Sequence, residues 1–351
     1  MTESTLRRAQ AASLLERAGL RNDRFDMAPC SKSGNNRVHK LSVEDRCFVA
    51  KWYVKDPHDP RDRLAAEWAF LRCAADAGIE PVPRPCAVLH GEGVALYSFV
   101  EGDKLTRQQV TSDHVAQAAR FLRALNGKRM RRSAETLAGA SEACFSLADH
   151  LALLEDRIAR LAAIAQGTPL DKEATELIAE LGATWHRVRR RIVTGAERMA
   201  LGLKTVLQPA DRCLSPSDFG YHNALVGADG SVTFIDFEYA GWDDPAKLIA
   251  DFFLQPAVPV DPVHRETIRT AVFARMDEDG RAHHGRRADL LQPLFALKWC
   301  CIMLNPFLPA WMARRGSNLS SAAIEGIKSD RVKATTRSLE AICRDHETVA
   351  G

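Results

Sequence analysis

Apolar and polar positions alternate over short stretches in the first hundred residues of the chain. Residues 36–43 (NRVHKLSV) and 46–54 (RCFVAKWYV) are short and rich in Val and aromatic side chains, which is typical of β-strands. Residues 84–90 (RPCAVLH) and 94–100 (VALYSFV) show the same character and are joined through a Gly-Glu-Gly turn. The pattern therefore predicts a small antiparallel sheet in this part of the chain.

One helix interrupts these strands. Residues 58–78 (HDPRDRLAAEWAFLRCAADAG) carry helix signals at both ends. Asp59 suits the N-cap, Pro60 suits the first helical position, and Gly78 suits the C-terminal end. We expect this helix to cover one face of the sheet.

The second part of the chain is predominantly helical. Residues 113–127 repeat apolar side chains at helical spacing, and residues 146–165 and 171–193 predict a helical hairpin. Strand signals return only at residues 224–226 and 232–235, with a glycine-containing turn between them. These two strands predict a single hairpin inside the helical part.

The change in pattern predicts an α+β protein with two lobes. We place the boundary after residue 102, with an N-terminal lobe of sheet and one helix over 1–102 and a larger, mostly helical lobe over 103–351. A length of 351 residues agrees with two or three domains.

Composition and charge remove several classes of function. Apolar residues make up 46% of the chain and charged residues 26%, as in an ordinary globular protein. The net charge of +3 is too small for a typical nucleic-acid binder, so we expect no nucleic-acid partner. Nine cysteines without a CxxC pair favour reduced thiols in the cytoplasm. The first twenty residues contain no apolar signal core.

One apolar stretch is long enough to raise the question of a membrane. Residues 290–308 contain Pro293, Lys298, Asn305 and Pro306 among their apolar side chains. This composition favours a buried helix over a membrane span, so we expect no membrane partner.

Three oxygen-bearing side chains lie beside the predicted hairpin. Asn223 comes just before its first strand and Asp236 just after its second, so an antiparallel hairpin brings both to the same end. Carboxylate and amide oxygens are ligands for Mg²⁺. Asp218, on the preceding loop, could orient an attacking hydroxyl or accept its proton. Together these groups suit phosphoryl transfer, although Asp and Asn are also common in turns for structural reasons alone.

The predicted sheet offers a cation for the same chemistry. Lys51 lies in the middle of a strand, between Ala50 and Trp52, and a buried Lys is costly unless it is paired. Glu67 lies on the apolar face of the following helix and is the expected partner. The alternative is a Lys on an edge strand with its ammonium in water, and a solvated Glu67.

A polar stretch precedes these strands. Residues 31–40 (SKSGNNRVHK) hold small and polar side chains that let a backbone turn tightly and direct N–H groups at an anion. Ser33, Gly34, Asn35 and Asn36 are the candidate phosphate contacts. An ordinary turn between two strands is the alternative.

The order of these residues resembles the aminoglycoside phosphotransferase and choline kinase superfamily of small-molecule kinases, which have a protein-kinase-like, bilobal fold. The resemblance covers roughly residues 24–255. A family loop similar to HGDLHPGN is PSDFGYHN here, and a family IDW or IDFE segment is matched by residues 235–238. GWDDPAKLIADF then resembles the family continuation.

The resemblance implies roles for particular residues and two cofactors, ATP and Mg²⁺. Asp218 is implied as the catalytic base, and Asn223 and Asp236 as metal ligands. Lys51, held by Glu67, is implied as the contact to the ATP phosphates.

LYSFVEG, residues 96–102, resembles the segment that connects the two lobes in the family. The adenine base is implied to bind there through the backbone of Tyr97, Ser98, Phe99 and Val100.

The chain departs from the family loop in two places. The family His two residues before the base is Pro216 here, and His-Pro-Gly between base and Asn becomes Gly220, Tyr221 and His222. We expect Tyr221 to pack inside the protein, and we leave the role of His222 open. Neither change removes the base or a metal ligand.

We therefore expect an ATP-dependent kinase of a small hydroxylated molecule: a sugar, an amino alcohol, a nucleoside-like compound or an antibiotic. A mildly basic chain argues weakly against a polycationic acceptor. The alternatives are a catalytically silent nucleotide-binding regulator of the same fold and a kinase that acts on a protein. The sequence does not identify the acceptor, its biological context or the oligomeric state.

Overall fold

The computed structural model describes residues 2–31, 36–55, 61–164, 167–315 and 319–348. The chain forms two compact units. The first unit combines Met1–Ser141, Cys213–Trp242 and Val260–Arg275, and the second combines the remaining segments. This division differs from the boundary expected after residue 102, which stays a prediction about lobes.

The first unit contains a five-stranded antiparallel sheet in the order β1-β2-β3-β5-β4. Its strands are β1 (Asp26–Ser31), β2 (Asn36–Val43), β3 (Arg46–Tyr53), β4 (Pro85–Leu89) and β5 (Val94–Ser98). The four strands that the sequence predicts are confirmed. The pattern missed β1, which lies at an edge and contains Pro29, a residue that sheets accept mainly at edges.

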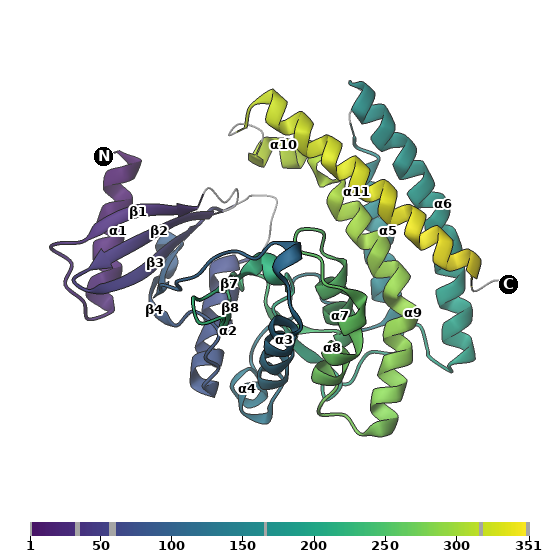
Figure 1. The fold of residues 1–351 in the computed structure, drawn as a ribbon, viewed down its shortest axis with the longest axis horizontal. Coiled ribbons are helices and arrows are strands. Elements are labelled where there is room, and N and C mark those ends of the chain that lie inside the picture. Colours follow the sequence, from purple (N-terminus) through teal and green to yellow (C-terminus); the bar gives the residue numbers. More distant parts are fainter. Residues whose placement is uncertain (1, 32–35, 56–60, 165–166, 316–318, 349–351) are drawn as a thin grey trace. The chain divides into compact units, whose positions relative to one another are not determined.

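Two helices contribute to the packing of this sheet (Figure 1). Helix α1 (Glu3–Arg17) buries Ala11, Leu14 and Leu15 in the same apolar core as the β3 residues Phe48, Ala50 and Trp52. Alternate side chains of a strand point to opposite faces, so Lys51 and Tyr53 face the other way. Helix α1 was not among the predicted elements.

Helix α2 (Arg63–Ala77) provides the partner for that other face. Asp62 caps its start by accepting from the Ala65 N–H at 2.9 Å, and Gly78 ends it in the left-handed conformation at φ 72°. The predicted end is confirmed. The predicted start at Asp59 and Pro60 is wrong, because Asp62 holds the capping position; residues 56–60 themselves lie outside the described part of the chain.

The predicted hairpin is confirmed. Strands β7 (Ala224–Val226) and β8 (Val232–Phe234) pair antiparallel. The Ile235 N–H donates to the Asn223 carbonyl at 2.9 Å, so the two ends of the hairpin meet. Gly102 lies against β7 at φ 149°, where an added Cβ would come within 2.7 Å of the Val226 carbonyl oxygen.

Further elements complete the first unit. They are α3 (Ser112–Leu125), α4 (Lys128–Ser133), β6 (Cys213–Ser215), β9 (Gly241–Asp243, whose last residue begins the second unit) and α8 (Arg265–Val272). Phe121 of α3 stacks on Phe234 of β8 with ring centroids 4.7 Å apart, which anchors the hairpin in an aromatic core.

The second unit is helical. It consists of α5 (Leu147–Leu161), α6 (Pro169–Arg198), α7 (Pro245–Leu254), α9 (Glu278–Met303), α10 (Pro309–Arg315) and α11 (Ser321–Thr348). Helix α9 packs against α5, α6, α7 and α11 (Figure 1). Helices α5 and α6 pack together, which confirms the predicted helical hairpin.

Within the described residues, the span Glu278–Phe307 is long and apolar enough to cross a membrane by length and composition. In its most apolar window, 61% is buried inside the protein, and a core helix of this kind passes the same test. Lys298 on this span is buried and pairs with Asp251 at 2.8 Å. These facts agree with the buried helix expected from the sequence.

Candidate active site

Lys51 is at the centre of the first unit's sheet. It lies on β3 between Val38 of β2 and Ala95 of β5, and it is 6% exposed. Its ammonium donates to Glu67 of α2 at 2.7 Å, so the predicted ion pair is confirmed. The alternative of an edge-strand Lys in water is wrong, because β3 has a neighbour on each side.

The ammonium of Lys51 also reaches the segment after β8. It lies 2.5 Å from Asp236 and 3.7 Å from Glu238. Burial lowers the pKa of Lys51, but the charges of Asp236, Glu67 and Glu238 outweigh that effect and hold the pKa well above its ordinary value. Lys51 is therefore a permanent cation next to Asp236.

Glu67 connects more groups than its pairing with Lys51 suggests. Its carboxylate also accepts from the Tyr53 hydroxyl at 2.6 Å and from the Phe237 N–H at 3.2 Å. The Tyr53 hydroxyl in turn lies 2.8 Å from that of Tyr97. Sequence reasoning missed these contacts, which tie helix α2 to the backbone next to Asp236.

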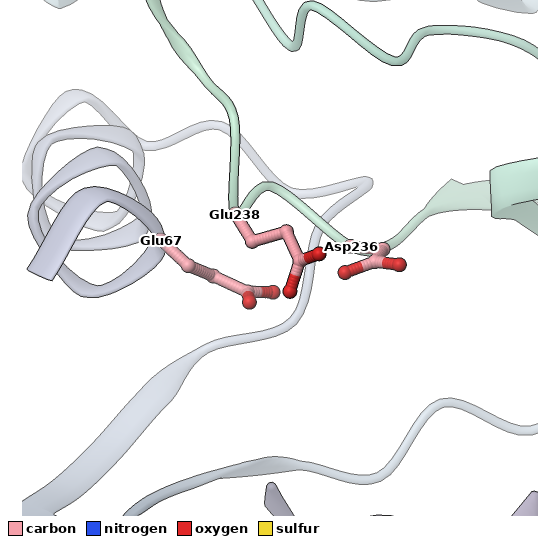
Figure 2. Close-up of side chains that lie close together, drawn as sticks. All are labelled: Glu67, Asp236 and Glu238. Carbon is pink, nitrogen blue, oxygen red and sulfur yellow. The ribbon is translucent and has the colours of Figure 1, made fainter. Parts of the chain in front are cut away.

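Glu238 is a further buried acid that sequence reasoning did not assign to the site. It is 3% exposed, accepts from the Asn36 amide at 2.6 Å and pairs with Arg63 at 3.4 Å. Figure 2 shows the carboxylates of Glu67, Asp236 and Glu238 close to one another. The signal for Glu238 is its place two residues after Asp236, within an otherwise apolar segment.

Asp218 and Asn223 lie together on the loop that precedes β7. The Asn223 amide nitrogen donates to the Asp218 carbonyl at 3.0 Å and to its carboxylate at 3.2 Å. The side chain of Asp218 is 40% exposed, as is that of Asp236. The structure thus brings the predicted base next to one predicted metal ligand and leaves its carboxylate accessible.

Two residues of the site have an unusual backbone. Ser217, just before Asp218, has φ 67°, and Asp236 has φ 69°. Residues other than Gly adopt this left-handed conformation rarely, and Glu44, Glu142 and Ala200 adopt it elsewhere in the chain. Ser217 and Asp236 belong to the two segments that carry the polar side chains of the candidate site.

The donor set at the end of the hairpin fits a magnesium ion. Because the Asn223 amide nitrogen faces Asp218, its amide oxygen faces away from that residue. The Asn223 carbonyl and the residue before Asp236 are joined by the hairpin's closing hydrogen bond. A neutral amide oxygen and a half-exposed carboxylate are suitable ligands for Mg²⁺. Their role as ligands stays a prediction.

The departures from the family loop have clear structural consequences. Tyr221 is fully buried beside Phe234, as expected, with ring centroids 6.4 Å apart. His222, whose role the sequence left open, lies with its Nε2 3.0 Å from the Asp218 carboxylate. Pro216 accepts from the Asp218 N–H through its carbonyl at 2.9 Å.

The predicted adenine contacts are only partly available. The Ser98 N–H donates to the Arg84 carbonyl at 2.9 Å, and the Phe99 N–H to that of Cys47 at 3.3 Å. The Tyr97 side chain is buried and points to Tyr53. Adenine binding here stays a prediction, and these bonds direct it towards Val100 and the carbonyl groups.

The predicted phosphate loop is only partly described. Ser33, Gly34 and Asn35 lie outside the described residues. Asn36 begins β2 and is 4% exposed, and its side chain binds Glu238. Asn36 thus lies near Lys51 through their shared partner, while its phosphate contact stays a prediction.

A family model described as the phosphotransferase enzyme family matches residues 26–254, which is more than half of the chain. A comparison with curated protein sequences finds no match. The matched range contains every residue of the predicted site.

Solved structures resemble this fold at low sequence identity. A choline kinase from Cryptosporidium parvum is 10% identical with a TM-score of 0.60, and the alignment covers 98% of this chain and 97% of that one. A choline kinase from Streptococcus pneumoniae is 15% identical with a TM-score of 0.58, and the alignment covers 96% of this chain and 99% of that one. A spectinomycin phosphotransferase in complex with ADP and spectinomycin is 14% identical with a TM-score of 0.57, and the alignment covers 94% of this chain and 98% of that one. These likenesses show a kinase-like fold.

Proposed function

Because the chain belongs to the phosphotransferase enzyme family and is thereby a small-molecule kinase, we propose that it transfers the γ-phosphoryl group of ATP to a hydroxyl group of its substrate. The observation that carries this proposal is the buried Lys51, whose ammonium bridges Glu67 of α2 and Asp236 after β8. A paired, buried cation beside an accessible carboxylate is what a nucleotide phosphate and its metal ion require.

Lys51 binds the phosphates of ATP. The ammonium is already charged and already oriented by Glu67, so it neutralises phosphate charge without first changing its conformation. The adenine base lies against the backbone near Val100, and Asn36 is the described member of the proposed phosphate contacts.

Asn223 and Asp236 would hold the magnesium ion of the Mg·ATP complex. When bound, the ion supplies charge neutralisation to the phosphate oxygens. Asp236 is the anionic member of the pair, so we assign it the larger share of the affinity.

Asp218 orients the acceptor hydroxyl and accepts its proton as the phosphoryl group transfers. Its carboxylate is accessible and is fixed by contacts from its own loop. A base of this kind acts within hydrogen-bond reach of the hydroxyl it deprotonates.

The acceptor class remains broad. The similar structures include choline kinases, an ethanolamine kinase from Plasmodium vivax and a spectinomycin phosphotransferase, which support an amino alcohol or an antibiotic as acceptor. A sugar and a nucleoside-like compound are the other acceptor classes expected from the sequence. We place the reaction in the cytoplasm, in keeping with the reduced thiols expected from the sequence.

A panel assay tests the proposed function. Purified protein is incubated with Mg·ATP and single hydroxylated compounds, among them choline, ethanolamine, spectinomycin, hexoses and nucleosides, and ADP release is measured. We expect one class to raise ADP release well above that with water as the acceptor, and Asp218→Asn to abolish the increase. Binding of Mg·ATP without ADP release for any compound, water included, would favour the silent regulator instead.

A further inference from the structure

The loop between Asp218 and Asn223 alternates between the core and the site. Phe219 packs against Phe234 with ring centroids 4.8 Å apart, and Tyr221 is fully buried. A turn of 3₁₀ helix over Tyr221–Asn223 then returns the next two side chains to Asp218. The aromatic anchors therefore determine where His222 lies.

Asp218 has a donor on each carboxylate oxygen. His222 Nε2 lies 3.0 Å from Oδ1, and the Asn223 amide nitrogen lies 3.2 Å from Oδ2. An ionised carboxylate only accepts hydrogen bonds, so Nε2 of His222 carries the proton in this contact. The side chain of His222 is 19% exposed, about half as much as that of Asp218.

The backbone of His222 is also held. The ammonium of Lys104 donates to its carbonyl at 2.7 Å. The backbone that carries the imidazole is thus held by its buried neighbour Tyr221 and by Lys104.

We propose that His222 is a positioning residue for the catalytic base, and that it holds the Asp218 carboxylate in the orientation that faces the acceptor hydroxyl. This inference rests on the proposed function. Since Nε2 donates to Asp218, it does not take up a proton from it, and His222 acts through the carboxylate without touching the reacting atoms. An exposed carboxylate with donors on both oxygens loses the freedom to rotate away from its substrate.

The position of this His differs from the His positions of the family loop. The family loop that this sequence resembles has one His two residues before the base, where Pro216 cannot donate a side-chain hydrogen bond, and another two residues after the base, where this chain has Gly220. Here the imidazole approaches from four residues after the base.

The test compares His222→Ala with His222→Gln, a variant whose amide can still donate. Rates of ADP release are measured with Mg·ATP and the most active panel compound, or with water as acceptor. We expect His222→Ala to lower kcat about 10- to 100-fold, the effect of one hydrogen bond to a charged group, while the KM for ATP stays within about twofold. His222→Gln should recover most of the loss.

A matched control separates this effect from the loss of any imidazole. His186 is exposed on α6, and His186→Ala should behave as wild type. Lys104→Met, which releases the backbone of His222, should lower kcat by a smaller factor. Melting curves for all variants show whether they are folded at the assay temperature.

The outcomes distinguish this inference from the proposed function. If Asp218→Asn keeps the wild-type rate, the proposed base is wrong and the role of His222 falls with it. If Asp218→Asn is inactive while His222→Ala keeps its kcat, only the inference is overturned. A loss that His222→Gln does not recover, or a loss confined to the KM for ATP, also overturns it.

Discussion

Each of the two units contains a cluster of buried charges, and the clusters differ in their access to solvent. In the first unit Lys51 lies between Glu67 and Asp236, and the side chain of Asp236 is 40% exposed. In the second unit Lys247 and Lys298 lie among two aspartates, and all four side chains are at most 4% exposed. Both clusters meet the requirement that buried charges be paired.

The difference shows which cluster a ligand can reach. In the second unit Asp251 accepts from Lys298 at 2.8 Å and from Trp299 at 2.8 Å, and Asp243 accepts from Lys247 at 2.6 Å. All of these bonds join protein groups, and their charged members are buried, so we call Asp243, Lys247, Asp251 and Lys298 the closed cluster. We call Lys51, Glu67 and Asp236 the open cluster. In the first unit the exposed carboxylates of Asp236 and Asp218 can exchange a protein partner for a ligand. Charges that are fully buried and fully paired stabilise the fold, whereas a buried cation next to an exposed carboxylate can bind a ligand.

The largest expected effect is at the open site. Asp218→Asn should lower the rate of phosphoryl transfer by about 10²- to 10⁴-fold, because it removes the proposed general base. ATP affinity should stay close to wild type, since Asp218 has no part in holding Lys51. Single-turnover transfer and ATP titration measure the two separately. Transfer at the wild-type rate would remove Asp218 from its role.

The closed cluster should respond through stability instead. Lys298→Met leaves Asp251 buried with its main partner removed, so the free energy of unfolding should fall by about 3–5 kcal/mol. Nucleotide affinity, measured at a temperature where the variant is folded, should be unchanged. The double variant Asp251→Asn/Lys298→Met should lose less than the sum of the two single variants. A change in ATP affinity without a change in stability would contradict the comparison.

The Lys51–Glu67 pair should affect both properties. Lys51→Met should slow transfer on the order of 10²-fold, and Glu67→Gln about 10-fold, since the ammonium would still be drawn to the phosphates. The double variant should lose less than the product of the two factors, because both residues act on one phosphate contact. Steady-state rates of the three variants decide this. Factors that simply multiply would show that Lys51 and Glu67 act independently.

Comparing Glu67→Ala with Glu67→Gln tests how much the other hydrogen bonds of Glu67 stabilise the fold. Glu67→Ala leaves the Tyr53 hydroxyl and the Phe237 N–H without their acceptor. We expect it to reduce the free energy of unfolding by about 1–3 kcal/mol more than Glu67→Gln does. Equal stability of the two variants would mean that those bonds contribute little.

The smallest expected effect is a pH dependence in the second unit. Burial alone would raise the pKa of Asp244, but Arg287 and His150 outweigh it and hold this pKa below its ordinary value. A carboxyl whose folded pKa is depressed stabilises the fold above its unfolded pKa of about 3.9, and the contribution is lost as pH falls towards the folded pKa. Stability should therefore decline below about pH 4.

Asp244→Asn isolates this contribution. The variant should flatten the acid limb of the stability curve by up to about 1.4 kcal/mol per pH unit, the value for one proton. Denaturant unfolding between about pH 2 and 6 measures the slope. An unchanged slope would mean that other carboxyl groups cause the acid sensitivity. Glu142 is one such group, because the neighbouring Arg157 lowers the pKa of its carboxyl.

Much of this organisation could be predicted from local sequence. The strands around Lys51 and the hairpin between Asn223 and Asp236 follow from alternation and turn residues, which are local signals. The Lys51–Glu67 pair could be predicted because only 16 residues separate its members and a buried Lys needs a partner. These inferences required no knowledge of distant packing.

Other features depend on long-range packing. The Asn36–Glu238 bond joins residues 202 positions apart, and no local pattern indicates such a contact. Helix α1 was missed because few of its residues are buried, so its apolar spacing is weak. Either Tyr221 or its neighbour His222 could pack into the aromatic core. Tyr221 is the residue that is buried there, which leaves His222 in contact with Asp218.

The most direct test of the comparison is the magnesium dependence of ATP binding. Calorimetric titration of ATP at increasing Mg²⁺ is performed on wild type, on Asp236→Ala and on Asp251→Asn, which changes a matched carboxylate of the closed cluster. We predict that Asp236→Ala loses the Mg²⁺-dependent gain in affinity, more severely than Asn223→Ala, whereas folded Asp251→Asn keeps it. Mg²⁺ titration curves of Asp236→Ala that match those of wild type would contradict the assignment of the open cluster as the nucleotide and metal site.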